Sequence, residues 1–230
     1  MPQPFFQTKL FWNVLLATWG LFASAGWFWV MQYSLTGTVT VGLDVPTRWP
    51  EGSTLEKNPT GPTILMFVHP RCPCSIASLR ELERVQAAAS SLKDRQPKWL
   101  IIAAVPSNAD SKWRESRLLS QAKVLPNTEV VWDLAGVEAQ RYKAITSGDV
   151  RFYNEHGQLL FSGGITTSRG HEGASKGGDQ LIALLCGGNR SMVTTAPVFG
   201  CQLYQISDVA PNQSLKAHEV ASKHEEGLNP

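Results

Sequence analysis

Apolar and polar positions follow two different periods in the middle of the chain, between residues 61 and 188. Short continuous apolar runs are typical of strands that are buried on both faces. Three such runs occupy residues 62–70, 98–105 and 128–134. In other segments apolar residues recur every three or four positions with charged residues on the opposite side, which predicts amphipathic helices. These helices are expected at residues 72–92, 111–124, 137–145 and 180–186.

Residues 149–164 predict a hairpin, because two apolar stretches flank the turn Asn154–Glu155–His156–Gly157. The expected order is therefore β-α-β-α-β-α-β-β-α. Strands that alternate with helices predict an α/β fold, with a mixed central sheet and helices on both of its faces. The hairpin is expected to make one edge of that sheet antiparallel.

The N-terminal pattern is different, because residues 11–33 are almost uncharged and show no polar side. As a helix, this segment is long enough to cross roughly 30 Å of hydrocarbon. Trp12 near one end, and Trp27, Trp29 and Tyr33 near the other, suit the level of the lipid headgroups. The sequence therefore predicts one transmembrane helix in contact with the lipid bilayer. The alternatives are a signal peptide cleaved after Ala23–Ser24–Ala25 and a buried core helix.

The orientation of this helix follows from the positive charges beside it. Lys9 precedes the helix, and no Lys or Arg follows it until Arg48. The positive-inside rule then places residues 1–10 in the cytoplasm. We expect a single-pass protein of the cell membrane whose domain lies in the periplasm or another extracytoplasmic space, where disulfides persist.

The remaining segments divide the chain further. Residues 34–60 are rich in Gly, Pro and Thr and are expected to form a linker before the domain of residues 61–188. Residues 189–207 are a C-terminal extension. Residues 208–230 lack apolar periodicity and are expected to be disordered. The net charge of +2, without a cluster of Lys or Arg, argues against nucleic-acid binding.

Candidate chemistry lies in the stretch HPRCPCS, residues 69–75, where the first buried strand meets the first helix. A thiolate is the reactive form of cysteine, and a helix N-terminus stabilises it. Cys72 and Cys74 are the candidate catalytic residues, with Cys72 as the nucleophile. Arg71 and His69 add positive or hydrogen-bonding character, and Pro73 suits a first helical turn.

The element order and this motif resemble the thioredoxin fold, and in particular membrane-anchored, extracytoplasmic thiol reductases of the TlpA type and the RedB-like group. The resemblance covers residues 61–188. It rests on the stretches ILMFVHPRCPCSIASLREL, VVWDLAGVEAQRYKAITSG and VRFYNEHGQLLFSGG. It implies a thiol–disulfide oxidoreductase without a cofactor. Its partners would be a protein substrate that bears thiols or a disulfide and an electron donor or acceptor.

Two positions depart from the pattern of that family. An ungapped alignment places Cys72 on the first cysteine of a C-x-x-C motif and Ser75 on the second, so that Cys74 is an additional thiol. With a gap, Cys74 becomes the resolving cysteine, although a Cys72–Cys74 disulfide would be tight. Gly148 stands where the family has a cis-proline beside which a peptide substrate pairs, and glycine cannot supply that locked bond.

Other interpretations of the same residues stay open. Copper(I) is an alternative cofactor, because His69, Cys72 and Cys74 could converge as soft ligands in an assembly factor of thioredoxin-like fold. A non-enzymatic thioredoxin-like module is a third alternative. His171, in the Gly-rich loop of residues 162–180, could approach Cys72 as a base or ligand.

The two C-terminal cysteines also allow two interpretations. We expect a structural disulfide between Cys186 and Cys201, which would fix the C-terminal extension to the domain. Alternatively, Cys201 returns to the active site as a resolving thiol.

Overall fold

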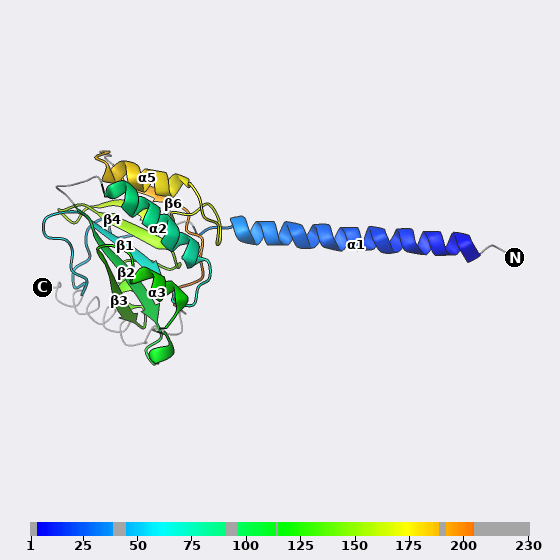
Figure 1. Cartoon of the computed structure of the whole chain (residues 1–230), viewed down its shortest axis with the longest axis horizontal. Coiled ribbons are helices and arrows are strands. Elements are labelled where there is room, and N and C mark those ends of the chain that lie inside the picture. Colours follow the sequence, from blue (N-terminus) through cyan, green and yellow to red (C-terminus); the bar gives the residue numbers. More distant parts are fainter. Residues whose placement is uncertain (1–3, 39–44, 91–95, 114, 189–191, 205–230) are drawn as a thin grey trace, which may run out of the picture.

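The computed structural model describes residues 4–38, 45–90, 96–113, 115–188 and 192–204. A long N-terminal helix, α1 (Pro4–Leu35), extends from an α/β domain, as Figure 1 shows. The tail that the sequence predicts to be disordered, residues 208–230, lies outside the described residues.

The domain contains the strands and helices that the periodicity predicts, together with one further strand. The strands are β1 (Thr63–Val68), β2 (Lys98–Val105), β3 (Thr128–Leu134), β4 (Asp149–Tyr153), β5 (Leu159–Gly163) and β6 (Thr194–Ala196). The helices are α2 (Ser75–Ala89), α3 (Arg117–Ala122), α4 (Val137–Arg141) and α5 (Lys176–Leu185), with a 3-10 turn, η1, at Ser111–Trp113. The strand that the sequence analysis missed, β6, lies in the C-terminal extension.

The sheet has the order β3-β2-β1-β4-β5-β6. The first three strands are parallel, whereas β4 is antiparallel to both β1 and β5. The hairpin therefore lies inside the sheet, and the prediction that it forms an antiparallel edge is wrong. It fails because β6 pairs with β5 in parallel and so takes the edge position.

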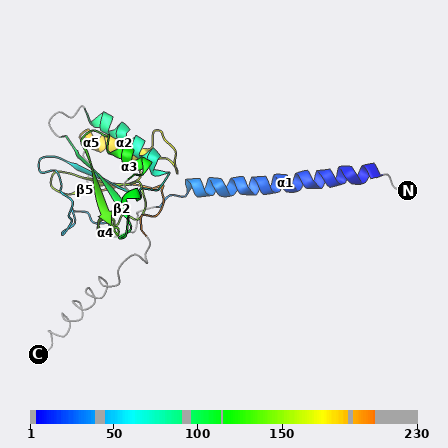
Figure 2. The ribbon, with the colours of Figure 1, turned by 60° about the horizontal axis from the view of Figure 1, so that its bottom comes forward.

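Alternate residues of the buried strands contact different helices, which confirms helices on both faces of the sheet. Ile64, Met66 and Val68 belong to one apolar cluster with residues of α2, α3 and α5. Leu65 and Phe67 belong to a second cluster with residues of α4. Figure 2 shows α2, α3 and α5 on one side of the sheet and α4 on the other. Burial on both faces explains why β1 and β2 are continuous apolar runs. The same expectation is wrong for β3, which lies at the edge of the sheet and has only Asp133 buried.

The helices that follow β2 and β3 are shorter than their patterns predict, and α2 is also shorter than the expected 72–92. The helix expected at residues 111–124 is interrupted because Ser116 is extended, with ψ 142°. Ser116 then caps α3 by accepting a hydrogen bond from the Leu119 N–H at 3.2 Å. The helix expected at residues 137–145 ends at Arg141, and Lys143 beyond it has φ +55°.

Part of the segment expected to be a linker packs on the face of the sheet that carries α4. Trp49 and Leu55 join the second apolar cluster. The carboxylate of Glu138 accepts hydrogen bonds from the hydroxyl of Ser53 at 2.7 Å and from the N–H of Thr54 at 3.2 Å. These contacts fix residues 49–55 to the domain.

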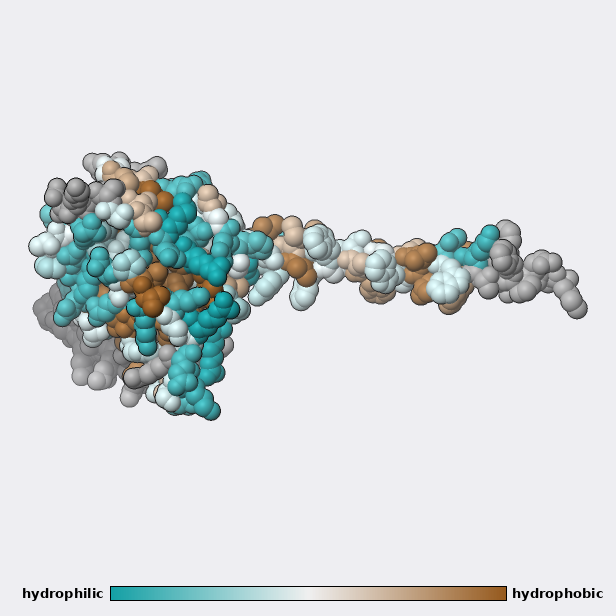
Figure 3. Space-filling view, in the orientation of Figure 1, coloured by the Kyte–Doolittle hydropathy of each residue, from teal (hydrophilic) through white to brown (hydrophobic). Residues whose placement is uncertain are grey.

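Helix α1 contains 32 residues and is therefore roughly 48 Å long at 1.5 Å per residue. Its segment Lys9–Leu35 is long and apolar enough to cross a membrane, and no part of that segment is buried. In Figure 3 the hydrophilic colours along α1 gather near its two ends. A single apolar helix that projects from the domain is compatible with a membrane anchor.

Candidate functional site

The junction between β1 and α2 positions the first two cysteines. A turn follows β1, in which the Cys72 N–H donates to the His69 carbonyl at 2.9 Å. Helix α2 begins at Ser75 with Cys74 as its N-cap, so Cys72 lies two residues before the cap. The N–H of Ser75 donates to the Cys72 carbonyl at 3.3 Å. Cys72 is buried, with 2 % of its surface exposed.

The Cys72 thiol is hydrogen-bonded to the thiol of Cys201, which lies 129 residues further along the chain. Their Sγ atoms are 3.0 Å apart, and the Cys201 N–H lies 3.4 Å from the Cys72 Sγ. A disulfide bond is about 2.05 Å long, so these two residues are free thiols in direct contact. The pair is placed so that formation of a disulfide requires little movement.

Cys201 reaches this position because the chain after β6 runs back along the loop before β4. We call residues 197–204 the strap. The Ser147 N–H donates to the Cys201 carbonyl at 2.7 Å, and the Leu203 N–H donates to the Ile145 carbonyl at 3.0 Å. Residues 146 and 202 form an antiparallel bridge between the same two segments. The strap is thus held by backbone pairing.

This placement corrects the expected disulfide between Cys186 and Cys201. Cys186 is an exposed, free cysteine at the C-terminal end of α5. The physical reason is the pairing of β6 with β5, which directs the extension across the sheet edge toward Cys72. The alternative that Cys201 returns to the first cysteine is the arrangement found.

The environments of the three neighbouring thiols give them different acidities. Burial alone would raise the pKa of Cys72, but hydrogen bonds from Cys201 and Ser75 outweigh burial and lower this pKa below its ordinary value. Burial, together with the neighbouring Cys72, raises the pKa of Cys74. Burial and the hydrogen bond with Cys72 raise the pKa of Cys201 to about 12. Cys72 is therefore the thiol best suited to act as the nucleophile.

Ser75 and Gly148 are the two departures from the pattern of the family that the sequence resembles. Ser75 contacts the loop before β4, and Gly148 is part of that loop. The hydroxyl of Ser75 lies 2.6 Å from that of Ser147, which also accepts the His69 N–H at 2.7 Å. Gly148 has φ +93°, and its N–H donates to the Phe67 carbonyl at 2.8 Å. No cis peptide bond occurs in the described part of the chain.

The basic residues of the motif are occupied by contacts with one another and with a tryptophan. The His69 ring packs edge-on against Trp113 at 5.5 Å, and its Nδ1 accepts the Arg71 N–H at 3.3 Å. The Arg71 guanidinium lies 3.9 Å from the centre of the Trp113 ring. Burial and the nearby Arg71 charge lower the pKa of His69, which favours neutral imidazole.

His171, the candidate base in the Gly-rich loop, is exposed. Its Nδ1 lies 2.9 Å from the carbonyl oxygen of Arg169. The sequence analysis did not identify Arg169 as a site residue, yet its guanidinium donates a hydrogen bond to the carbonyl of Gly200, next to Cys201. The feature of the sequence that could have pointed to Arg169 is that it is the single arginine in this Gly- and Ser-rich loop. Ser147, which holds both the strap and the start of the motif, gave no such signal.

A copper site would need His69, Cys72 and Cys74 to converge. Across the described ranges, no group of three or more His, Cys, Asp or Glu side chains is arranged to hold a metal ion. His69 packs on Trp113, and its Nδ1 is occupied by the Arg71 N–H. Within the described residues, His69, Cys72 and Cys74 are therefore not assembled as a three-ligand site.

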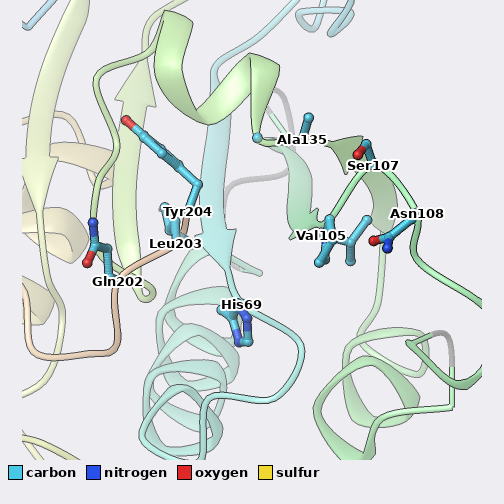
Figure 4. Close-up of a pocket in the computed structure, with 10 residues that line it drawn as sticks. His69, Val105, Ser107, Asn108, Ala135, Gln202, Leu203 and Tyr204 are labelled. Atoms are coloured by element: carbon cyan, nitrogen blue, oxygen red, sulfur yellow. The ribbon is translucent and has the colours of Figure 1, made fainter. Parts of the chain in front are cut away.

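A cleft of about 450 Å³ lies beside the cysteines, at the carboxyl ends of β1, β2 and β3. Figure 4 shows His69 at the end of β1, with Gln202, Leu203 and Tyr204 of the strap on one side of it. The residues at the other side are Val105, Ser107, Asn108 and Ala135. The carboxyl ends of parallel strands are the usual place for ligands in such sheets.

Comparison with known proteins gives similarity at the level of the fold. No family model matches the sequence, and no curated protein does. An uncharacterized conserved protein from Geobacillus kaustophilus is 16% identical with a TM-score of 0.52, over 71% of this chain and 94% of that one. A secreted Mycobacterium tuberculosis disulfide oxidoreductase homologous to E. coli DsbE is 20% identical with a TM-score of 0.37, over 68% and 97%. Yeast Sco1 with copper bound is 15% identical with a TM-score of 0.39, over 55% and 77%.

Proposed function

We propose that this chain is a membrane-tethered thiol–disulfide oxidoreductase whose redox couple is Cys72 and Cys201. The premise is a thioredoxin-like domain with a cysteine motif where β1 meets α2. The single observation that carries the proposal is the 3.0 Å contact between the two Sγ atoms. The lowered pKa of Cys72 supports its role as the attacking thiolate.

The proposed reaction has two exchange steps. The Cys72 thiolate attacks one sulfur of a substrate disulfide, forms a mixed disulfide and releases one substrate thiolate. Cys201 then attacks the Cys72 sulfur, which forms the Cys72–Cys201 disulfide and releases the second substrate thiolate, and the Cys201 proton passes to a released thiolate. Two electrons reach the substrate, and an external dithiol restores the couple. All of the electrons travel through sulfur, so the proposed reaction uses no metal or cofactor.

Cys74 is a third thiol within this proposal. Cys74 is the N-cap of α2 and lies close enough to Cys72 for a negative charge on Cys72 to contribute to the raised pKa of Cys74. Its raised pKa keeps it protonated at neutral pH, so it reacts more slowly than Cys72. A Cys72–Cys74 bond would close a ring with a one-residue spacer, whereas Cys201 approaches without that constraint. We therefore assign Cys74 a secondary role, as a thiol able to open a stalled mixed disulfide.

The proposed location is outside the cytoplasm, with α1 as a retained anchor. Helix α1 is apolar and exposed, and Lys9 is the charge that precedes its uncharged run. The positive-inside rule then leaves the N-terminus in the cytoplasm and the domain outside. A disulfide-forming couple is useful in that compartment, because disulfides persist there.

The pairing can be tested by peptide mapping of the full chain in detergent micelles. After oxidation with a soluble disulfide and tryptic digestion without reductant, we expect the peptide of residues 72–80 to be linked to that of residues 191–216. Because Cys72 and Cys74 share one tryptic peptide, the Cys74→Ser variant serves as the matched form and should keep the link. Cys72→Ser should abolish exchange with a peptide disulfide.

Two outcomes would contradict the proposal. A bond between Cys186 and Cys201 would return Cys201 to a structural role. A bond within residues 72–80, with Cys201 free, would make Cys74 the resolving thiol.

A further inference from the structure

Arg169, in the loop between β5 and α5, joins the end of the anchor to the strap. Its guanidinium donates to the carbonyls of Tyr33 at 3.2 Å, Thr36 at 3.4 Å and Gly200. It also lies 4.7 Å from the centre of the Tyr33 ring. Its backbone N–H donates to the Ser34 carbonyl at 3.2 Å. One side chain thus binds the last turn of α1 and the residue that precedes Cys201.

The segment after α1 reinforces this connection by pairing with the strap. Thr38 and Val198 form an antiparallel bridge with N–O distances of 2.8 and 2.9 Å. The hydroxyl of Thr146, in the loop that holds Cys201, lies 3.0 Å from that of Thr38. Gly37 packs so closely on Phe199 that an added Cβ would lie 2.8 Å from its ring. The contacts of Arg169 therefore belong to a continuous interface.

This interface determines which side of the domain faces the bilayer. Tyr33 ends the apolar span, where aromatic rings favour the headgroup level. A single guanidinium separates Tyr33 from Gly200, and Cys201 directly follows Gly200. In Figure 1 the yellow loop before α5 and the orange segment after β6 lie on the side from which α1 extends. The thiol pair therefore lies close to the headgroups.

We infer that Arg169 holds the domain with its Cys72–Cys201 pair toward the membrane surface, so that the pair reacts with thiols or disulfides presented at headgroup level. The inference rests on the proposed function and on α1 as its anchor. A partner in the same leaflet reaches this side of the domain by lateral diffusion. A large soluble protein would have to enter the gap between the domain and the lipid.

The chain contains an internal reference for this geometry. Cys186 is exposed at the far end of α5, and the loop that contains Arg169 precedes the near end of that helix. At 1.5 Å per residue the 10 residues of α5 separate the two ends by roughly 15 Å. A reagent fixed to the headgroups should therefore distinguish Cys186 from the site thiols.

The experiment measures how fast the cysteines of the full chain, in phosphatidylcholine nanodiscs, react with a pyridyl disulfide that is supplied in two forms. The first form is a phosphatidylethanolamine that carries a pyridyl disulfide on its headgroup, and the second is a water-soluble pyridyl disulfide. Mass spectrometry reports which cysteines have reacted, including those oxidised to an internal disulfide. We expect the lipid form to modify the site thiols at least about tenfold faster than Cys186, because tethering raises its local concentration there. The soluble form should modify exposed Cys186 readily.

Two changes should remove this preference. Arg169→Ala combined with a six-residue Gly/Ser insertion after Leu35 should lower the reaction of the site thiols with the lipid form about fivefold or more. The measured quantity is the ratio of the lipid rate to the soluble rate of the same variant, because the Arg169 charge also lowers the pKa of Cys74 and Cys201. Arg117→Ala, which removes an exposed arginine at the start of α3, is the matched control and should change neither rate.

Equal modification of Cys186 and the site thiols by the lipid form would overturn the inference. If the soluble form still oxidised Cys72 and Cys201 in that case, the proposed function would stand and only the orientation would be wrong. Preferential lipid labelling without any Cys72–Cys201 disulfide would support the orientation and contradict the proposed couple.

Discussion

Three thiols close together differ in the donors and charges that surround them. As a thiolate, Cys72 accepts hydrogen bonds from Cys201 and Ser75, and these bonds lower its pKa. Burial, followed by the interaction with Cys72, raises the pKa of Cys74 and of Cys201 and so favours their protonated forms. A single nucleophile therefore arises in a group of chemically identical side chains.

The effect of Cys201 on the acidity of Cys72 can be measured directly. Cys201→Ala removes the thiol donor but keeps the backbone N–H, so we expect the pKa of Cys72 to rise. Only the thiolate is alkylated, so the alkylation rate of Cys72 falls as the pH drops through the pKa of Cys72. The midpoint of this fall should lie at higher pH in the Cys201→Ala variant. The measurement uses iodoacetamide in a background of Cys74→Ser and Cys186→Ser.

The midpoint is the relevant quantity, because the smaller side chain also exposes Cys72 and would raise the plateau rate without moving the midpoint. The same background with Cys201 retained is the control. A midpoint that stays in place or moves to lower pH would show that Cys201 does not stabilise the thiolate.

At the scale of elements, the site consists of a loop and a strap that hold each other. The loop of residues 145–148 carries Gly148 where related folds have a cis-proline, and its backbone pairs with the strap. In the family that the sequence resembles, a peptide substrate pairs beside this position. Here the chain's own residues 201–203 are found there. Gly148 fits because its φ of +93° suits glycine and because its N–H is used.

Restoring a side chain at this position should therefore destabilise the domain. In Gly148→Ala the new Cβ would lie 2.8 Å from the Ser78 hydroxyl, in a backbone conformation that L-residues avoid. We expect a loss of about 2 kcal/mol or more in the free energy of unfolding, measured by urea denaturation in micelles. Gly148→Pro should be worse, because it also removes the N–H that donates to Phe67.

Gly52→Ala is the matched control for the backbone contribution. Gly52 has φ +72° with nothing within 4 Å of an added Cβ, so only about 1 kcal/mol of conformational cost is expected. Equal losses for the two alanine variants would mean that the contact with Ser78 relaxes without cost.

At the scale of the whole molecule, one apolar helix and one α/β domain meet through a few specific contacts beside the thiol pair. Helix α1 has no buried part along Lys9–Leu35, whereas residues 36–38 pair with the strap. Residues 33–38, at the end of α1 and just after it, therefore contribute to the geometry of the site. The proposed orientation and the proposed couple depend on this same junction.

The topology of the chain is tested with a fusion of alkaline phosphatase after Pro230. The enzyme needs disulfides and is active only outside the cytoplasm, so we expect activity from the fusion in whole cells. Moving the positive charge, by Lys9→Gln together with Gln32→Lys, should lower that activity, because orientation follows the flanking charge. An inactive parent fusion that is present in full would place the domain in the cytoplasm and remove the basis for a persistent disulfide.

Local pattern was sufficient for most elements and for the position of Cys72 between β1 and α2. The run at residues 98–105 coincides with β2, because a strand buried on both faces leaves a continuous apolar run. The run at residues 128–134 coincides with β3, although only Asp133 of this edge strand is buried. The uncharged run of residues 11–33 was sufficient to predict the long apolar helix, because a helix forms hydrogen bonds only between residues that are close in the sequence. Cys72 was identifiable because a buried strand followed by a helical period fixes where the junction lies.

Only the tertiary structure decided which distant segments meet. The sequence favoured Cys186 as the partner of Cys201, because 15 residues separate them, whereas 129 residues separate Cys201 from Cys72. The outcome depends on the three-residue strand β6, which is too short to produce a period of its own. Its pairing with β5 directs the strap past Ser147, whose hydrogen bond holds Cys201 beside Cys72. Periodicity reports which face of an element is buried, but the partner of a cysteine follows from backbone pairing between segments far apart in the chain.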